Sequence, residues 1–197
     1  MNDARLKAFV LEALETEVGG VDIYATALTC CQNKDLKKEW TKYRDQTKEH
    51  VEALLDICAQ MSIDSEEETP GRAVVRQIGE SLVAAMKMAV AAGDKTAAEL
   101  VACDCVTFAE TKDHANWELI GHLAKTVAVE HREILQDVYT TIEEEEDQHL
   151  YHTIGWGREL ALKALGLPAV LPPPEEAQKV KSAVGAAHAK TKRSKAV

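Results

Sequence analysis

The chain has 197 residues, 46% of them hydrophobic and only 5% aromatic, and its formal net charge is −10. This length supports one domain with its own core, and the wealth of Ala, Leu, Glu and Lys with few Gly and Pro favours an all-α fold. No stretch of about 18 apolar residues occurs and the first residues are charged. We therefore expect neither a membrane span nor a secretory leader, and a cytoplasmic protein.

The cysteines argue against a framework of disulfides or zinc. They are an odd set of five without CxxC spacing: Cys30, Cys31, Cys58, Cys103 and Cys105. They fall on apolar helical faces, so we expect reduced, mostly buried thiols.

Helical periodicity and breaker residues together predict five helices in chain order. They cover residues 3–31, 34–61, 72–92, 95–125 and 129–165. Gly93 ends the third helix, Asp94 caps the fourth, and Gly166 with Pro168 ends the fifth. The turn between the last two helices contains neither Gly nor Pro, so it is the boundary that the sequence defines least.

Short links between the first two and the last two helices predict two antiparallel hairpins, joined by a long crossover that carries the third helix. We expect an antiparallel four-helix bundle over residues 1–170. The Pro and then Ala/Lys-rich residues 171–197 should form a flexible tail. Residues 175–197 carry a net charge of +4 against −14 for the rest of the chain. The tail is either a solvated extension or a weak contact for nucleic acid or another protein.

In each of the four long helices, steps of three and four residues trace an apolar stripe that ionisable side chains interrupt. The interrupting residues are Glu17, His50, Glu110, and Glu146 with His149. A buried carboxylate without a partner is costly, so such groups pair, change protonation state, reach solvent or bind a cation. Glu17 and His50 both lie about 25 Å from the turn between the first two helices, and Glu110 and Glu146 lie at similar distances from the turn between the last two, which favours a shared cation.

One Glu from each of two helices with Glu-x-x-His from the other two is the pattern of di-metal bundle sites, and this chain resembles the ferritin-like superfamily across residues 3–165. The resemblance rests on Glu17 followed by Tyr24, on KEHVEALL around His50, and on EDQH from Glu146. Within the superfamily, YRDQTKEHVEALLDI and AETKDHANWELI are most similar to the bacterial YciE/YciF-type ferritin-like stress proteins.

One position departs from the ferritin pattern. Thr47 stands three residues before His50, where ferritins place a Glu, and it cannot bridge two ions as a carboxylate does. Asp113, His114, Glu49 or water would compensate if a ligand is missing. Glu145 competes with Glu146 for the inward position in the run EEEEDQH.

The resemblance implies a protein that binds iron, two ions if the site is complete, or manganese. It would oxidise Fe(II) or reduce O2 or peroxide in stress protection, as a non-haem di-iron oxidase, and would form a homodimer. Whether it is an enzyme stays open, because Thr47 equally fits a catalytically inactive bundle with a structural or interaction role. A zinc scaffold fits less well, since the proposed ligands are rich in carboxylates.

Overall fold

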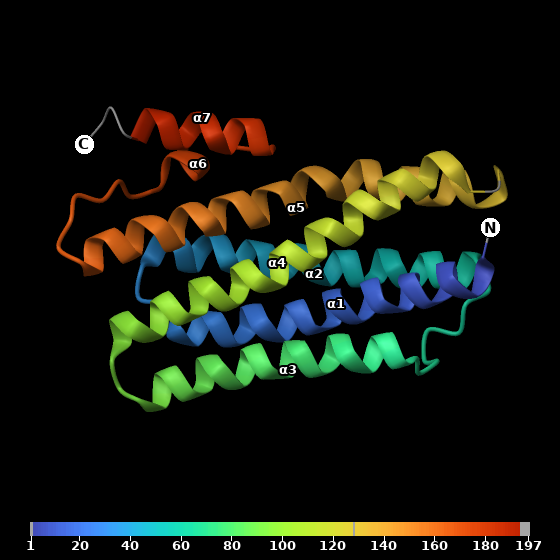
Figure 1. Ribbon diagram of the computed structural model, residues 1–197, viewed down its shortest axis with the longest axis horizontal. Helices are drawn as coiled ribbons and strands as arrows, with labels where there is room; N and C mark the ends of the chain where they lie inside the picture. The colour runs from blue at the N-terminus through green and yellow to red at the C-terminus, as the bar shows by residue number, and fades with distance from the viewer. Residues whose placement is uncertain (1, 128, 194–197) are drawn as a thin grey trace.

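The computed structural model describes residues 2–127 and 129–193, and over these ranges the protein is an all-α bundle without a strand (Figure 1). The described helices are α1 (Asp3–Cys30), α2 (Lys34–Gln60), α3 (Pro70–Ala91), α4 (Lys95–Thr126), α5 (Val129–Ala164), α6 (Pro174–Ala177) and α7 (Ala183–Arg193). The five predicted long helices are confirmed to within two residues at each end. No helix in the described ranges has both the length and the apolar character that a membrane crossing requires.

The four longest helices form two antiparallel pairs, α1 with α2 and α4 with α5. As predicted, a long crossover joins the pairs. α3 follows the loop after α2, runs back along the outside of α1 and returns the chain to the opposite end of the bundle, where α4 begins (Figure 1).

The helix ends follow local chemistry. The side chains of Asn2, Asn33, Thr69 and Asp94 accept hydrogen bonds from backbone N–H groups of the first turns of α1, α2, α3 and α4. Gly93 after α3 and Gly166 after α5 have φ of 85° and 73°, the left-handed conformation that glycine adopts at little cost. The predicted cap at Asp94 is therefore confirmed.

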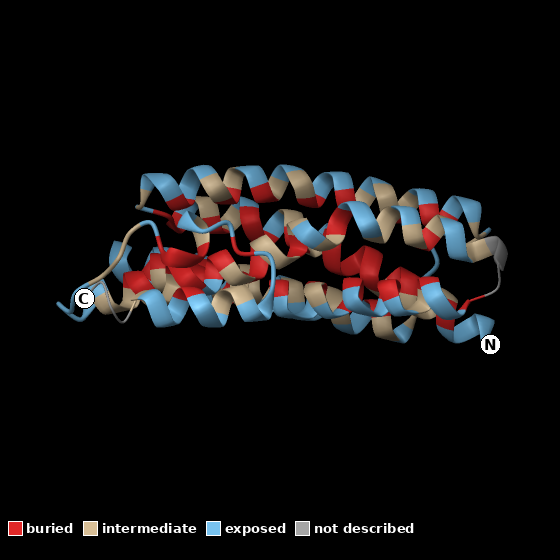
Figure 2. Cartoon of the chain, turned by 90° about the horizontal axis from the view of Figure 1, so that it is seen from above, coloured by how far each residue is buried: buried red, intermediate tan, exposed pale blue. Residues whose placement is uncertain are grey.

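The core consists of two apolar clusters, one toward each end of the bundle, and Figure 2 shows the buried residues along its inner faces. On α1, one cluster takes residues between 6 and 14 and the other residues between 23 and 31. On α4 the order is reversed, so the first cluster takes residues after 116 and the second takes residues before 107. Glu17 and Glu110 thus lie between the clusters, in a polar layer across the middle of the bundle.

The expectation of a flexible tail is wrong for residues 174–193, which form α6 and α7 and lie along α5. Arg158 of α5 donates two hydrogen bonds to Glu175, at 2.7 and 2.8 Å, and Arg193 donates to Glu159 at 2.7 Å. Val180 is buried beside them. Composition suggested that the tail had little to bury, but ion pairs with side chains of α5 hold it in place. Residues 194–197 lie outside the described residues.

Candidate metal centre

The polar layer contains five of the predicted ligands together with Asp113. Glu17, His50, Glu146 and His149 are at most 1% exposed, and Glu110 and Asp113 are 4% and 5% exposed. Two apolar clusters close the layer from both ends of the bundle. Carboxylates at this depth need compensation by charge, hydrogen bonds or a cation.

A first group of potential ligands joins α1, α2 and α5. His50 Nδ1 lies 3.4 Å from Glu17 Oε1 and 2.9 Å from Glu146 Oε1. One ligand atom from each residue falls within 4.8 Å of the other two. Three helices therefore bring two carboxylates and an imidazole to one point.

A second group joins α4 and α5. His149 Nδ1 lies 3.6 Å from Glu110 Oε2 and 3.3 Å from Glu146 Oε1, and the ligand atoms of all three again lie within 4.8 Å of one another. Glu146 belongs to both groups, and the His50 and His149 rings are stacked with centroids 5.7 Å apart. One carboxylate is thus shared between two adjacent ligand sets.

The facing atoms of these groups are close but do not have hydrogen-bond geometry. Among the described residues, the buried atoms without a hydrogen-bond partner include Glu17 Oε2, His50 Nδ1, Glu110 Oε2, both oxygens of Glu146 and His149 Nδ1. Buried polar groups of proteins normally have partners. Several unpartnered atoms that converge on one space are what a bound cation would satisfy, so the residues present fit a metal.

The other ring nitrogen of each histidine is held in place. His50 Nε2 donates to Glu145 Oε2 at 3.0 Å, and His149 Nε2 donates to Gln46 Oε1 at 3.1 Å. Because both partners accept, the neutral histidines carry hydrogen on Nε2 and leave the Nδ1 lone pair facing the shared space. Trp117 likewise orients Glu17, since its Nε1 donates to Glu17 Oε1 at 2.7 Å.

These contacts decide between the two glutamates of the EEEEDQH run. Glu146 occupies the inward position, whereas Glu145 is about one third exposed and orients His50 from outside. Gln46, the hydrogen-bond partner of His149, is a residue of the candidate site that the sequence did not point to. The only sequence signal for Gln46 is that it precedes His50 by one helical turn, and this spacing is common to many polar residues.

The charges of the layer couple its pKa values. Burial opposes ionisation of Glu146, but His149 and His50 outweigh it and lower the pKa of that carboxyl to about 2. Burial, together with the charge of Glu146, raises the pKa values of Glu17 and Glu110. Burial alone would lower the pKa of His149, but the negative charges of Glu146 and Glu110 have the larger effect and raise it to about 9. Without a metal, protons balance the charge, and a cation would replace them.

The remaining candidate residues, Thr47, Asp113 and His114, have different surroundings. Thr47 donates to the backbone oxygen of Tyr43 at 2.9 Å and supplies no ligand atom. Asp113 is buried with Oδ1 unpartnered, and burial with the charge of Glu17 raises its pKa well above the usual range. His114 lies outside both groups and faces Glu118 and Asp147 at 3.6 Å. Neither residue belongs to the two ligand groups, but Asp113 is a buried carboxylate of the same layer, whereas His114 faces acidic residues outside it.

A cavity between α2 and α5 reaches the layer from outside. It has a volume of about 350 Å³, and His50 lies on its wall together with Glu49, Asp137 and Glu145. All three acidic residues lie on the solvent side of His50, and no Lys or Arg lines this cavity in the described chain. The cavity gives cations a negatively charged approach to the site.

Comparison with known proteins finds no protein family, curated protein or solved structure that matches this chain. The fold and the site define its class only as an all-α bundle with a buried layer of carboxylates and histidines that could hold metal ions.

Proposed function

We propose that the protein is a ferritin-like carboxylate protein that binds two iron or manganese ions in the polar layer and oxidises Fe(II) or reduces O2 or peroxide. The sharing of Glu146 between two ligand sets is the observation that carries this proposal. A carboxylate that belongs to two adjacent ligand sets suits a pair of cations, since it could serve as a ligand to both. The similarity of the helix motifs to YciE/YciF-type proteins supports a role in stress protection.

The donor atoms favour iron or manganese over zinc. Three glutamates and two histidines give an oxygen-rich set of hard ligands, whereas structural zinc sites are usually tetrahedral and rich in Cys. The buried cysteines do not take part in either ligand set.

Each residue has a role that follows from its position. Glu17 with His50 would hold one ion and Glu110 with His149 the other, while Glu146 would contact both. Glu145 and Gln46 keep the Nδ1 atoms directed inward. When bound, the metal pair would supply the electrons for reducing an oxidant. The two apolar clusters exclude water from both ends of the layer.

A second candidate function rests on Thr47, whose hydroxyl is used within its own helix. A bundle that lacks one bridging carboxylate could be catalytically inactive and serve as a structural or interaction protein. In that case protonated histidines would permanently balance the acidic layer.

Metal content per chain tests the proposal directly. Protein purified without chelator should be measured by mass spectrometry, before and after anaerobic Fe(II) loading and exposure to air. We expect about two irons per chain and a new near-ultraviolet absorption band. No bound metal under either condition would leave the structural role. Sedimentation of the same samples tests the proposed homodimer.

A further inference from the structure

A pocket on the outer face of the bundle lies between α1, α3 and α4. α3 stays beside α1 whereas α4 slants away from α3 after their short connection, so a wedge opens between them (Figure 1). The wedge contains a cavity of about 160 Å³. It is separate from the polar layer, because Thr16 and Ala109 line it while their neighbours Glu17 and Glu110 point into the bundle.

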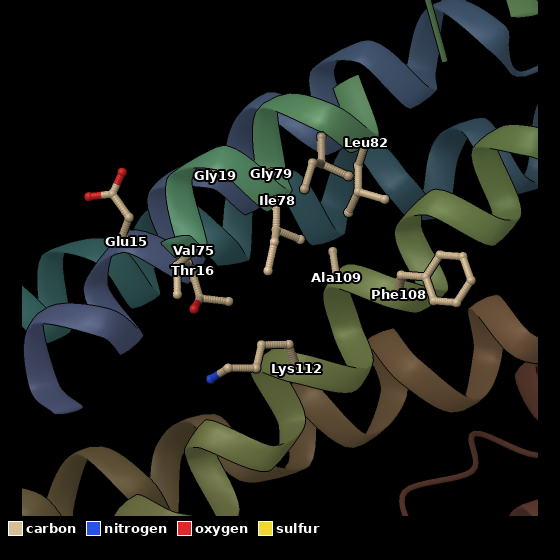
Figure 3. Close-up of a pocket in the computed structure, with 11 residues that line it drawn as sticks. Glu15, Thr16, Gly19, Val75, Ile78, Gly79, Leu82, Phe108, Ala109 and Lys112 are labelled. Atoms are coloured by element: carbon tan, nitrogen blue, oxygen red, sulfur yellow. The ribbon is translucent and has the colours of Figure 1, made fainter. Parts of the chain in front are cut away.

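The wall of this pocket is almost entirely apolar. Figure 3 shows Ile78 and Leu82 of α3 directed toward Ala109 of α4 across the gap. Ile78 is 56% exposed and Phe108 is 66% exposed, so large apolar side chains remain in contact with water near the pocket. Covering them with an apolar ligand is favourable.

The polar groups beside this wall already have partners, with the exception of one charged group that lacks a partner of opposite charge. Glu15 points away from the gap (Figure 3) and is paired with two arginines. The Thr16 hydroxyl donates to the backbone oxygen of Glu12 and accepts from Asn116. The exception is Lys112, which extends along one end of the pocket.

Lys112 is a solvent-exposed cation at the edge of the pocket, without a carboxylate partner. Its ammonium group donates to Asn116 Oδ1, and it forms no ion pair with any residue that the structure describes. An ammonium group has three donors, so the hydrogen bond to Asn116 leaves it able to bind an anion.

We propose that this pocket binds a small monocarboxylate with an apolar body of about six to eight carbons, its carboxylate on Lys112 and its body between α3 and α4. A cavity of about 150 Å³ lined by aliphatic side chains accommodates benzene, which sets this size. A single ammonium group suits one carboxylate, whereas phosphate is commonly held by several donors or by the fork of an arginine. The proposal does not depend on metal binding.

Calorimetric titration of the full, metal-free chain with octanoate tests the proposal. Octanoate should bind the native protein, and octylammonium should bind at least about tenfold more weakly because its charge opposes Lys112. Lys112→Met keeps the apolar stem and should weaken octanoate about tenfold while leaving the binding of 1-octanol within about twofold. Lys125→Met removes an exposed lysine from the same helix and should change neither affinity.

A second variant tests the pocket itself. Gly19 lines the cavity, and a Cβ added there meets no atom within 4 Å, so Gly19→Leu starts without a clash and directs its side chain into the cavity. Leucine also favours the helix more than glycine does. We expect this variant to fold and to lose both octanoate and octanol binding.

Three results would overturn the proposal. One is no octanoate binding to the native chain, and another is equal octanoate affinity in the Lys112→Met variant. The third is a native dimer that Gly19→Leu converts to monomers in sedimentation, since a second copy of the chain would then cover the pocket.

Discussion

Glu15 and Glu17 are two residues apart on α1 and both are buried, yet their surroundings differ in kind. Glu15 faces α3 and accepts hydrogen bonds from Arg72 Nε at 2.6 Å and Arg76 Nε at 2.7 Å. Glu17 faces the middle of the bundle, where its Oε1 accepts from Trp117 and its Oε2 has no partner. One helix thus presents a fully paired carboxylate on one face and an incompletely paired one on another.

The two pKa shifts run in opposite directions. Burial opposes ionisation of Glu15, but hydrogen bonds from Arg76 and Arg72 outweigh it and lower its pKa. For Glu17 burial dominates over the effect of His50, and the pKa is raised. Burial alone therefore does not identify a ligand. A buried carboxylate whose neighbours leave its charge unbalanced is the better candidate for metal binding.

Loss of Glu146 should have the largest effect, because both ligand sets include it. In the Glu146→Ala variant we expect iron to fall from about two ions per chain to none. Glu15→Gln is the matched control, since it alters a buried glutamate that belongs to neither ligand set, and it should retain both ions. Equal metal content in Glu146→Ala and the native protein would place the metal elsewhere.

Loss of Glu15 should instead affect stability. Glu15→Gln leaves Arg72, which is 9% exposed, without its charged partner. Breaking a buried ion pair from one side costs about 3 kcal/mol, and urea unfolding of the metal-free protein would measure it. Glu110→Leu is the comparison, and it should be neutral or stabilising because it removes a carboxylate whose burial is poorly compensated. Similar losses in the two variants would contradict the distinction.

Local sequence signals were sufficient to predict the helices and the buried polar residues between the two apolar clusters. Caps and glycines such as Asp94 and Gly93 act within a few residues, and the polar interruptions of the apolar stripes follow from helical periodicity. Glu146 could not be separated from Glu145 in this way, because consecutive helical residues differ by only about 100° in direction. Packing against α2 resolves that choice.

The features that were missed depend on contacts between distant parts of the chain. The tail is held by Arg158 and Arg193, which meet carboxylates that are not adjacent in sequence. Gln46 orients a histidine 103 residues away. Such pairings have no period and no local motif, so the sequence alone favoured a flexible tail and gave no role to Gln46.

The pH dependence of stability should separate the two environments. The pKa of His149 is raised from 6.5 to about 9 in the folded chain, so its contribution is complete below pH 6.5 and is lost as the pH rises through 9. Glu15 has a lowered pKa, so its contribution is present at neutral pH and is lost in acid. Metal-free protein should therefore unfold at lower urea concentration at pH 9.5 than at pH 6.5.

The control for this prediction is Glu15→Gln, which should keep the alkaline loss of stability, whereas His149→Gln should reduce it. Metal binding should reverse the sign for the native protein. Deprotonated histidines bind metal better, so the stabilisation by added Mn(II) should increase from pH 6.5 to pH 8. An alkaline loss that is unchanged in His149→Gln would show that other groups cause it.

Exposed carboxylates form a third environment, and the smallest effect is expected there. Glu49 and Asp137 line the cavity that leads to His50 but belong to neither ligand set. Replacing both by their amides should slow Fe(II) uptake about threefold in stopped-flow absorbance at low salt, while the final metal content stays the same. Because surface charges are screened, the difference should nearly vanish at 0.5 M NaCl. A lower final metal content instead would mean that Glu49 and Asp137 bind the ions rather than guide them. The ligand sets would then extend from His50 into the cavity.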